Sequence, residues 1–442
     1  METVLLYILG VVVMLLGVLI SIGLHEVGHL IPAKKFGVHV GQYMIGFGKT
    51  LWSKKVGDTE YGLKAIPLGG YISMAGMYPP AKGETVARDS STGFMDTLMQ
   101  DARDTSAEGV PDERDERVFY KLASWKRIII MLGGPAMNLL IGIVLYTIVL
   151  CGFGVVQATT TVGSVAECLK PATSSATECA ATDEPAPAAA AGFLPGDRIV
   201  SIDGTPISET RDATAIINAS PDTQLTIVVE RDGAEKTIDV TPELTEVYAT
   251  DDSNQVIEDA DGNPVTEKRG IMGVTFAEAI VQQPITAVAP TVGDNIVRVG
   301  NLILNLPQRL IDVVNAAFGP EERDPNGPLS VVGVGRIAGE ITSLTTIPVV
   351  DRISSLTQIL ASLNIALFVF NLIPLLPLDG GHVAGALFDA VRRFFAKAFK
   401  RPVPRPVDIA KLIPLTLAVT LLLGAMSVLL IYADIVKPIT IL

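Results

Sequence analysis

The chain has 442 residues, of which 49% are apolar, and its formal net charge at pH 7 is −13. A mean hydropathy of +0.43 is compatible with such an acidic excess only if apolar and acidic residues occupy separate parts of the chain. The composition therefore excludes an ordinary water-soluble protein in which apolar and charged residues are mixed evenly along the chain. It also lacks the basic surplus of a nucleic-acid-binding protein, so no nucleic acid is expected as a partner.

Four stretches are long and apolar enough to form membrane spans. A helix that crosses the hydrocarbon core needs about 20 predominantly apolar residues. The sequence meets this requirement within residues 1–36, 128–156, 356–385 and 412–435. The first stretch is not expected to be a cleaved signal peptide, because Glu2 stands in place of a basic n-region and the apolar run from Val4 to Leu24 is too long.

Basic residues predict the orientation of these spans. Lys34 and Lys35 follow the first span, and a basic loop at 386–411 joins the third span to the fourth. Positive residues favour the cytoplasmic side, so both connections are expected there. This orientation predicts a multi-pass membrane protein, with residues 157–355 and both termini outside the cytoplasm.

The first span ends in His25-Glu26-Val27-Gly28-His29, which contains two of the four histidines of the chain. On a helix, the HExxH pattern places two imidazoles on one face, within reach of a single zinc ion. The glutamate between them can accept a proton from water that the metal activates. The alternative, two buried histidines without a metal, would leave three ionisable groups in an apolar helix at a cost of several kcal/mol.

Residues 37–78 predict a small β-sheet at the cytoplasmic membrane face, and 79–127 a flexible cytoplasmic loop. An open edge strand in this sheet could accept an extended peptide, although an ordinary hairpin is an alternative reading. Alternating apolar and polar positions with turn signals predict four short strands, which are Val38–Phe47, Thr50–Val56, Glu60–Ile66 and Tyr71–Met74.

The segment at 157–250 contains Gly192-Phe193-Leu194-Pro195-Gly196-Asp197, a predicted helix at Thr210–Asn218 and a predicted hairpin around Asp232-Gly233. With these features it resembles a PDZ domain of the type found in bacterial envelope proteases. Such domains bind peptide ends or edges by strand addition, but this one could also act only as a spacer or size filter.

Cys168 and Cys179 lie in this external segment and could form a disulfide or remain two thiols. Residues 251–355 predict a linker followed by amphipathic helices interrupted near Pro307.

A catalytic zinc site needs a third protein ligand. Asp379 is the leading candidate, because it follows an apolar span in a segment broken by two prolines and two glycines. Irregular backbone at membrane depth is tolerated where it lines a wet cavity, and an intramembrane aspartate is a functional candidate. His382 competes for this role but should lie nearer water, while His39 is expected to have no part in the site.

HExxH in one span together with Asn371-Leu372-Ile373-Pro374 and Leu378-Asp379-Gly380 resembles the site-2 protease family of intramembrane zinc metalloproteases. The four-span layout is similar to the bacterial branch that contains the regulator of sigma-E protease, although only one PDZ module is readable here. The resemblance predicts a multi-span α-helical membrane protein with four transmembrane helices, a cytoplasmic membrane-associated β-sheet and an extracytoplasmic PDZ-like α+β domain.

The same resemblance implies a zinc metalloendopeptidase that cleaves single-span membrane proteins in regulated intramembrane proteolysis. Zn²⁺ would be held by His25, His29 and Asp379, with Glu26 as the base. The expected substrates include trimmed anti-sigma factors. Residues expected to hold the unwound substrate are Asn371, Asn138, Gly69, Gly70, Tyr71 and Ile72.

Two alternatives remain open at this stage. The same site could cleave signal-peptide remnants, or the chain could be a non-catalytic PDZ-bearing membrane scaffold that needs no zinc. A transporter is disfavoured because no internal repeat is visible in the sequence.

Overall fold

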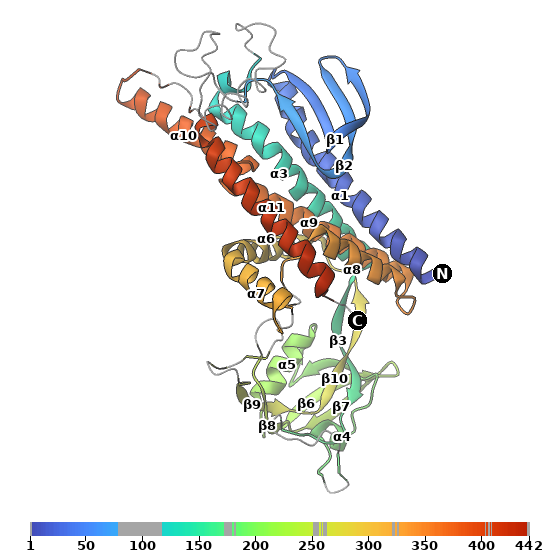
Figure 1. The fold of residues 1–442 in the computed structure, drawn as a ribbon. Coiled ribbons are helices and arrows are strands. Elements are labelled where there is room, and N and C mark those ends of the chain that lie inside the picture. The colour runs from blue at the N-terminus through green and yellow to red at the C-terminus, as the bar shows by residue number, and fades with distance from the viewer. Residues whose placement is uncertain are drawn as a thin grey trace. The chain divides into compact units, whose positions relative to one another are not determined.

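The computed structural model describes residues 2–77, 117–171, 179–180, 183–250, 256–257, 259, 263–320, 323–324, 327–402, 404, 407 and 409–439. The predicted loop at 79–127 therefore lies largely outside the described residues. The chain divides into two compact units (Figure 1). The first combines Met1–Phe153 with Gln283–Leu442, and the second is Gly154–Gln282.

The first unit contains four helices that are long and apolar enough to cross a membrane. They are α1 (Glu2–Lys35), α3 (Ser124–Thr147, continued by the π-helical segment η2, Ile148–Phe153), α9 (Val349–Asn371) and α11 (Ile413–Val436). Large side chains such as Val4, Leu140 and Leu421 are exposed on them, as expected for helices that face lipid. The four spans predicted from the sequence are thus confirmed as apolar helices.

The end of the third span differs from the prediction. Helix α9 ends at Asn371, and after a break a separate helix, α10, runs over Asp379–Ala398. The prediction of a loop from 386 onward is therefore wrong as far as Ala398. The segment contains no proline or glycine after Gly385, and its buried residues His382, Ala386 and Asp389 recur at helical spacing. The basic residues belong to an amphipathic helix.

A bent two-stranded sheet lies at the C-terminal end of α1 (Figure 1). Its strands, β1 (Val40–Val56) and β2 (Thr59–Met74), take the place of the four short strands predicted from the sequence. The first part of β1 pairs on one side with Gly70–Met74 and on the other with Glu60–Leu63. Each strand therefore supplies two of the four expected segments. The far edge of Gly70–Met74 pairs with no strand in the described part of the chain.

The sheet is attached to α1 and α3 by an apolar core and by Tyr43. The core includes Leu30 of α1, Val40 and Met74 of the sheet, and Ile130 of α3. The Tyr43 hydroxyl donates a hydrogen bond to the Gly23 carbonyl at 2.7 Å. Burial, with the Glu26 carboxylate nearby, raises the pKa of Tyr43 to about 12, so the hydroxyl stays protonated and remains a donor.

Three further helices of the first unit follow the second unit in the chain. They are α6 (Val288–Leu304), α7 (Leu306–Phe318) and α8 (Val331–Ser343). The expected interruption near Pro307 is present, because α6 ends at Leu304 and Pro307 lies in the first turn of α7. Helix α8 lies within the 251–355 segment for which amphipathic helices were expected. The side-chain hydroxyl of Ser330 caps it by accepting hydrogen bonds from the N–H groups of Val332 and Gly333. The short 3-10 segments of this unit are η1 (Phe119–Lys121), η3 (Ile285–Ala287) and η4 (Ile409–Leu412).

The second unit is built on a sheet with strand order β10-β3-β4-β6-β7. The predicted helix and hairpin are present as α5 and as β6 with β7, and the hairpin turns at Asp232 and Gly233, both with positive φ. Strands β9 and β10 lie where the sequence predicted a linker, so the unit extends beyond residue 250. Its elements are β3 (Val155–Val165), α4 (Pro187–Ala191), β4 (Arg198–Ile202), β5 (Thr205–Pro206), α5 (Thr210–Ala219), β6 (Leu225–Arg231), β7 (Ala234–Val240), β8 (Glu243–Tyr248), β9 (Thr266–Ile271) and β10 (Val274–Val281).

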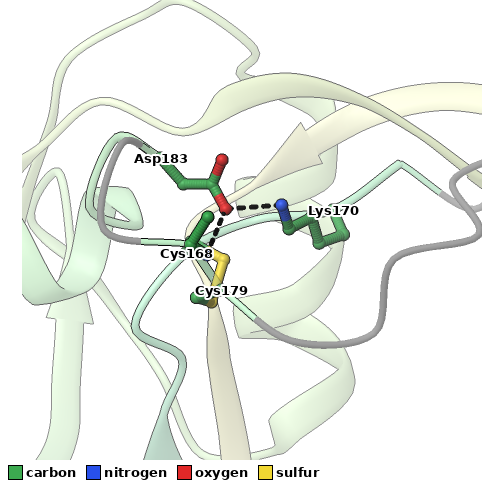
Figure 2. The surroundings of a disulfide bond; sticks show 5 residues. Cys168, Lys170, Cys179 and Asp183 are labelled. Carbon is green, nitrogen blue, oxygen red and sulfur yellow. Dashed lines mark hydrogen bonds and ion pairs between the residues drawn. A yellow bond between two sulfur atoms is a disulfide. The ribbon is translucent and has the colours of Figure 1, made fainter.

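Figure 2 shows the disulfide bond that joins Cys168 and Cys179 in this second unit. Beside it, the Asp183 carboxylate accepts hydrogen bonds from Lys170 Nζ and from the backbone N–H of Ala180. These two donors hold the pKa of Asp183 below its usual value.

Candidate metal centre

Three side chains, two from helix α1 and one from helix α10, come together at one place in the first unit. His25 and His29 come from α1, and Asp379 is the first residue of α10. Asp379 Oδ2 lies 3.3 Å from the Nε2 atom of each histidine, and the two Nε2 atoms are 3.2 Å apart. Among the described residues, these are the one group of three His, Cys, Asp or Glu side chains close enough to hold a metal ion.

The separations fit zinc. Tetrahedral zinc binds nitrogen and oxygen at about 2.0–2.1 Å, which puts neighbouring ligand atoms about 3.3–3.4 Å apart. The three atoms therefore form one face of such a tetrahedron. The carbonyl oxygen of Ile130 lies 2.8 Å from His29 Nδ1, and a carbonyl can only accept. His29 in its neutral form thus carries its hydrogen on Nδ1 and presents the lone pair of Nε2 to the other two groups.

Glycines allow α3 to pass directly behind the two histidines. A Cβ atom added at Gly28 would lie 2.2 Å from the Gly133 carbonyl oxygen, so the two backbones are in contact. A Cβ added at Gly134 would lie 2.2 Å from His29 Nε2 and 2.7 Å from His25 Nε2. The absence of a side chain at Gly134 leaves room on this side of both nitrogens.

The break before α10 positions the carboxylate. A Cβ added at Gly380 would lie 2.3 Å from the Ile373 carbonyl oxygen, so the segment after α9 folds tightly against the first turn of α10. Asp379 is in that first turn, where the backbone N–H groups of a helix favour a negative charge.

A cavity of about 310 Å³ opens next to the three groups. Its wall includes Glu26, which is only 7% exposed, and the strand residues Gly70, Tyr71 and Ile72 of β2. A Cβ added at Gly70 would lie 3.0 Å from Glu26 Cγ, so this strand passes close to the glutamate. An extended peptide lying against the strand would therefore be near Glu26.

The remaining candidate residues lie in different places. Asn371 and His382 line the cavity, whereas Gly69 and Asn138 are not among the described residues of its wall. The side chain of Asn138 is instead buried against His25. His39 lies away from the site, with its Nδ1 atom 3.7 Å from Asp58 Oδ2.

Two features of α3 that shape the site were not predicted from the sequence. They are the Ile130 carbonyl oxygen beside His29 and the lack of a side chain at Gly134. A backbone carbonyl leaves no mark in a sequence. The Gly133-Gly134 pair in an apolar span was a signal of close helix packing.

Comparison with known proteins identifies the family. The model of peptidase family M50 matches residues 13–415. The chain belongs to peptidase family M50. This membership confirms the site-2 protease family predicted from the motifs.

The relatives match along most of their length. The chain is 34% identical to the zinc metalloprotease Rip1 of Mycobacterium tuberculosis and 32% identical to Rip1 of Mycolicibacterium smegmatis, over 98% of each chain in both cases. It is 27% identical to the metalloprotease MmpA of Caulobacter vibrioides, over 87% of this chain and 88% of the relative.

Proposed function

We propose that the protein is a zinc metalloendopeptidase that hydrolyses a peptide bond within or near the membrane span of a single-span membrane protein. The observation that carries the proposal is the convergence of the Nε2 atoms of His25 and His29 with Asp379 Oδ2, at mutual distances of 3.2–3.3 Å, beside the cavity that Glu26 lines. The names of the M50 relatives, which are zinc metalloproteases, support the same metal.

In this mechanism His25, His29 and Asp379 hold the metal, and Glu26 moves the proton. Bound Zn²⁺ supplies a Lewis acid that polarises a peptide carbonyl and makes water more acidic. The Glu26 carboxylate lies on the same helix between the two histidines and faces the same cavity, so it can take a proton from water there. The oxygen of that water bonds to the peptide carbonyl carbon, and Glu26 returns the proton to the amine nitrogen as the C–N bond breaks.

The substrate in this proposal lies extended along Gly69–Ile72, with Asn371 as a further contact. A helical substrate keeps its carbonyls in internal hydrogen bonds, so the cleaved stretch must first unwind. The far edge of Gly70–Met74 pairs with no strand of the described chain, which supports recognition by strand addition. Asn371 lines the same cavity.

The cavity is proposed to face the cytoplasmic side of the bacterial inner membrane, with the second unit outside the cytoplasm. Lys34 and Lys35 at the end of α1, and the basic residues of α10, support this orientation. The second unit is proposed to be a PDZ domain that recognises trimmed substrates. Strand β10 is at an edge of its sheet, where a peptide strand could be added.

Trimmed anti-sigma factors are the proposed substrates, in a pathway of regulated intramembrane proteolysis. Signal-peptide remnants are the second candidate, because they present the same kind of apolar helix to the cavity. Incubating the purified protein with one substrate of each kind distinguishes the two.

The central test is the Glu26→Gln variant of the full-length protein in detergent, with a model single-span substrate. Loss of the general base should lower the cleavage rate by at least about 100-fold, while one zinc ion per chain is retained. Zinc content is measured by elemental analysis and cleavage by gel electrophoresis.

Glu2→Gln, at the exposed start of the same helix, is the matched control and should cleave at the wild-type rate. Normal cleavage by Glu26→Gln would remove Glu26 from the mechanism. A wild-type protein that holds no zinc and cleaves nothing would instead favour the scaffold alternative.

A further inference from the structure

Residues of helix α3 lie within hydrogen-bonding distance of the Nδ1 atoms of His25 and His29. The Ile130 carbonyl oxygen lies 2.8 Å from His29 Nδ1, and the side-chain amide of Asn138 lies 3.0 Å from His25 Nδ1. The two histidines are thus held from the same helix, one by backbone and the other by a side chain.

The contacts of Ile130 and Asn138 differ in whether they determine which ring nitrogen of the histidine carries the hydrogen. The Ile130 carbonyl accepts only, and this fixes the hydrogen of neutral His29 on Nδ1. The amide of Asn138 can either donate through its nitrogen or accept through its oxygen, and a half-turn of the amide exchanges the two. With the nitrogen toward His25, the buried Oδ1 atom of Asn138 has no hydrogen-bond partner among the described atoms.

Metal binding through His25 Nε2 requires the lone pair on that nitrogen and therefore a hydrogen on Nδ1. An Nδ1–H group needs an acceptor, and the only acceptor on the Asn138 side chain is Oδ1. Turning the amide so that Oδ1 faces His25 satisfies both groups at once.

We infer that Asn138 is a positioning residue of the metal centre, whose amide oxygen accepts from His25 Nδ1–H and so directs His25 Nε2 toward His29 and Asp379. This inference rests on the proposed zinc site. It gives Asn138 a different role from the substrate contact that the family resemblance implied.

Burial supports this role. Asn138 is 1% exposed and is not among the residues that line the cavity, so a substrate in that cavity would not reach it. A polar amide in an apolar span is costly unless it has a partner, and here the partner is a ring that must keep one orientation.

The test uses full-length protein in detergent and Zn²⁺ alone, titrated against a chromophoric chelator. Asn138→Leu keeps the size of the side chain but removes the acceptor, and zinc affinity should fall about 10- to 100-fold. Asn138→Asp restores an acceptor, and its affinity should stay within a few-fold of the wild type. Asn138→Ala replaces the Leu variant if that protein does not fold.

Asn364 provides the matched control, because it is a fully buried amide in a spanning helix that donates to Ser21 Oγ at 3.0 Å. Asn364→Leu should lower the thermal unfolding midpoint without changing zinc affinity.

Zinc affinity within twofold of the wild type in Asn138→Leu, equal losses in the Asn138 and Asn364 variants, or no recovery in a folded Asn138→Asp would each overturn the inference. A wild-type protein that fails to bind one zinc ion would instead overturn the proposed function.

Discussion

Gly134 is the residue on which the approach of α3 to the histidine pair depends. A methyl group there would lie 2.2 Å from His29 Nε2, far inside van der Waals contact. Gly134→Ala must therefore push α3 away or rotate the rings. We expect cleavage to fall by about 100-fold, because displacements of about 1 Å in a catalytic group have effects of this size. Cleavage rate and zinc content of the purified variant measure the outcome.

Gly424→Ala is the control for this substitution. Gly424 also lies in a spanning helix, α11, but a Cβ atom there would meet nothing within 4 Å. The variant should keep wild-type activity and zinc content. If Gly134→Ala behaved like Gly424→Ala, the close packing of α3 on the histidines would be wrong.

At the scale of elements, the attachment of α10 to α3 decides where Asp379 lies. Arg127 and Asp389 form a buried ion pair at 2.8 Å between the two helices, with both side chains 3% exposed. Asp389 Oδ1 also accepts a hydrogen bond from the backbone N–H of Val407. Three parts of the chain thus meet at the Asp389 carboxylate, which lies on the same helix as Asp379.

Asp389→Ala should destabilise the protein by about 3–5 kcal/mol, because it leaves the Arg127 charge buried and unpaired. Asp389→Asn should be less damaging, since an amide oxygen can still accept from Val407. Thermal unfolding in detergent gives the comparison. The half-exposed pair of Arg309 and Asp324 is the control, and Asp324→Ala should have an effect of at most about 1 kcal/mol. Equal effects of the two alanine variants would refute the importance of burial.

The parts of the fold that could be predicted are those determined by residues close together in the sequence. The long apolar runs and the HExxH spacing within one helix depend on neighbouring residues only. Asp379 could be selected as a candidate ligand because prolines and glycines mark the break before α10. The order of β10 beside β3 was not predictable, because these strands are far apart in the chain and are joined only through tertiary pairing.

The same reasoning explains why α10 was not predicted as a helix. The residues of α10 were taken for a loop because their basic side chains dominate the composition, although the apolar positions recur at helical spacing. The role inferred for Asn138 could not be predicted from the sequence either, because 113 positions separate Asn138 from His25 and only the tertiary structure brings them together.

At the scale of the whole molecule, the second unit contains a carboxylate that makes its stability depend on pH. Asp197 has a side chain with 0% exposure and accepts hydrogen bonds from Arg231 and from the backbone N–H of Leu194. The Arg231 guanidinium holds the pKa of Asp197 below its ordinary value of 3.8.

A folded-state pKa below the unfolded one contributes stability that is complete above the unfolded pKa and is lost as pH falls through the folded one. Acid should therefore weaken the wild-type unit, while Asp197→Asn should be less stable at neutral pH and lose less on acidification. Pulsed hydrogen exchange with mass spectrometry on peptides from 198–240 of the full-length protein tests this. A constant difference between the two proteins from neutral pH to about pH 3 would contradict it.

The proposed orientation predicts which surfaces are accessible in intact cells. Asp232 is at an exposed turn of the second unit, and Lys400 follows α10 on the side predicted to be cytoplasmic. In a Cys151→Ala background, Asp232→Cys should react with a membrane-impermeant maleimide in cells whose outer layer has been made permeable. Lys400→Cys should react only after the inner membrane is opened, because the positive residues around it are retained on the cytoplasmic side. Lys55→Cys, at the exposed C-terminal end of β1, should behave like Lys400→Cys. Labelling of Lys55→Cys or Lys400→Cys in cells with a closed inner membrane would put the cavity on the opposite side from the one proposed.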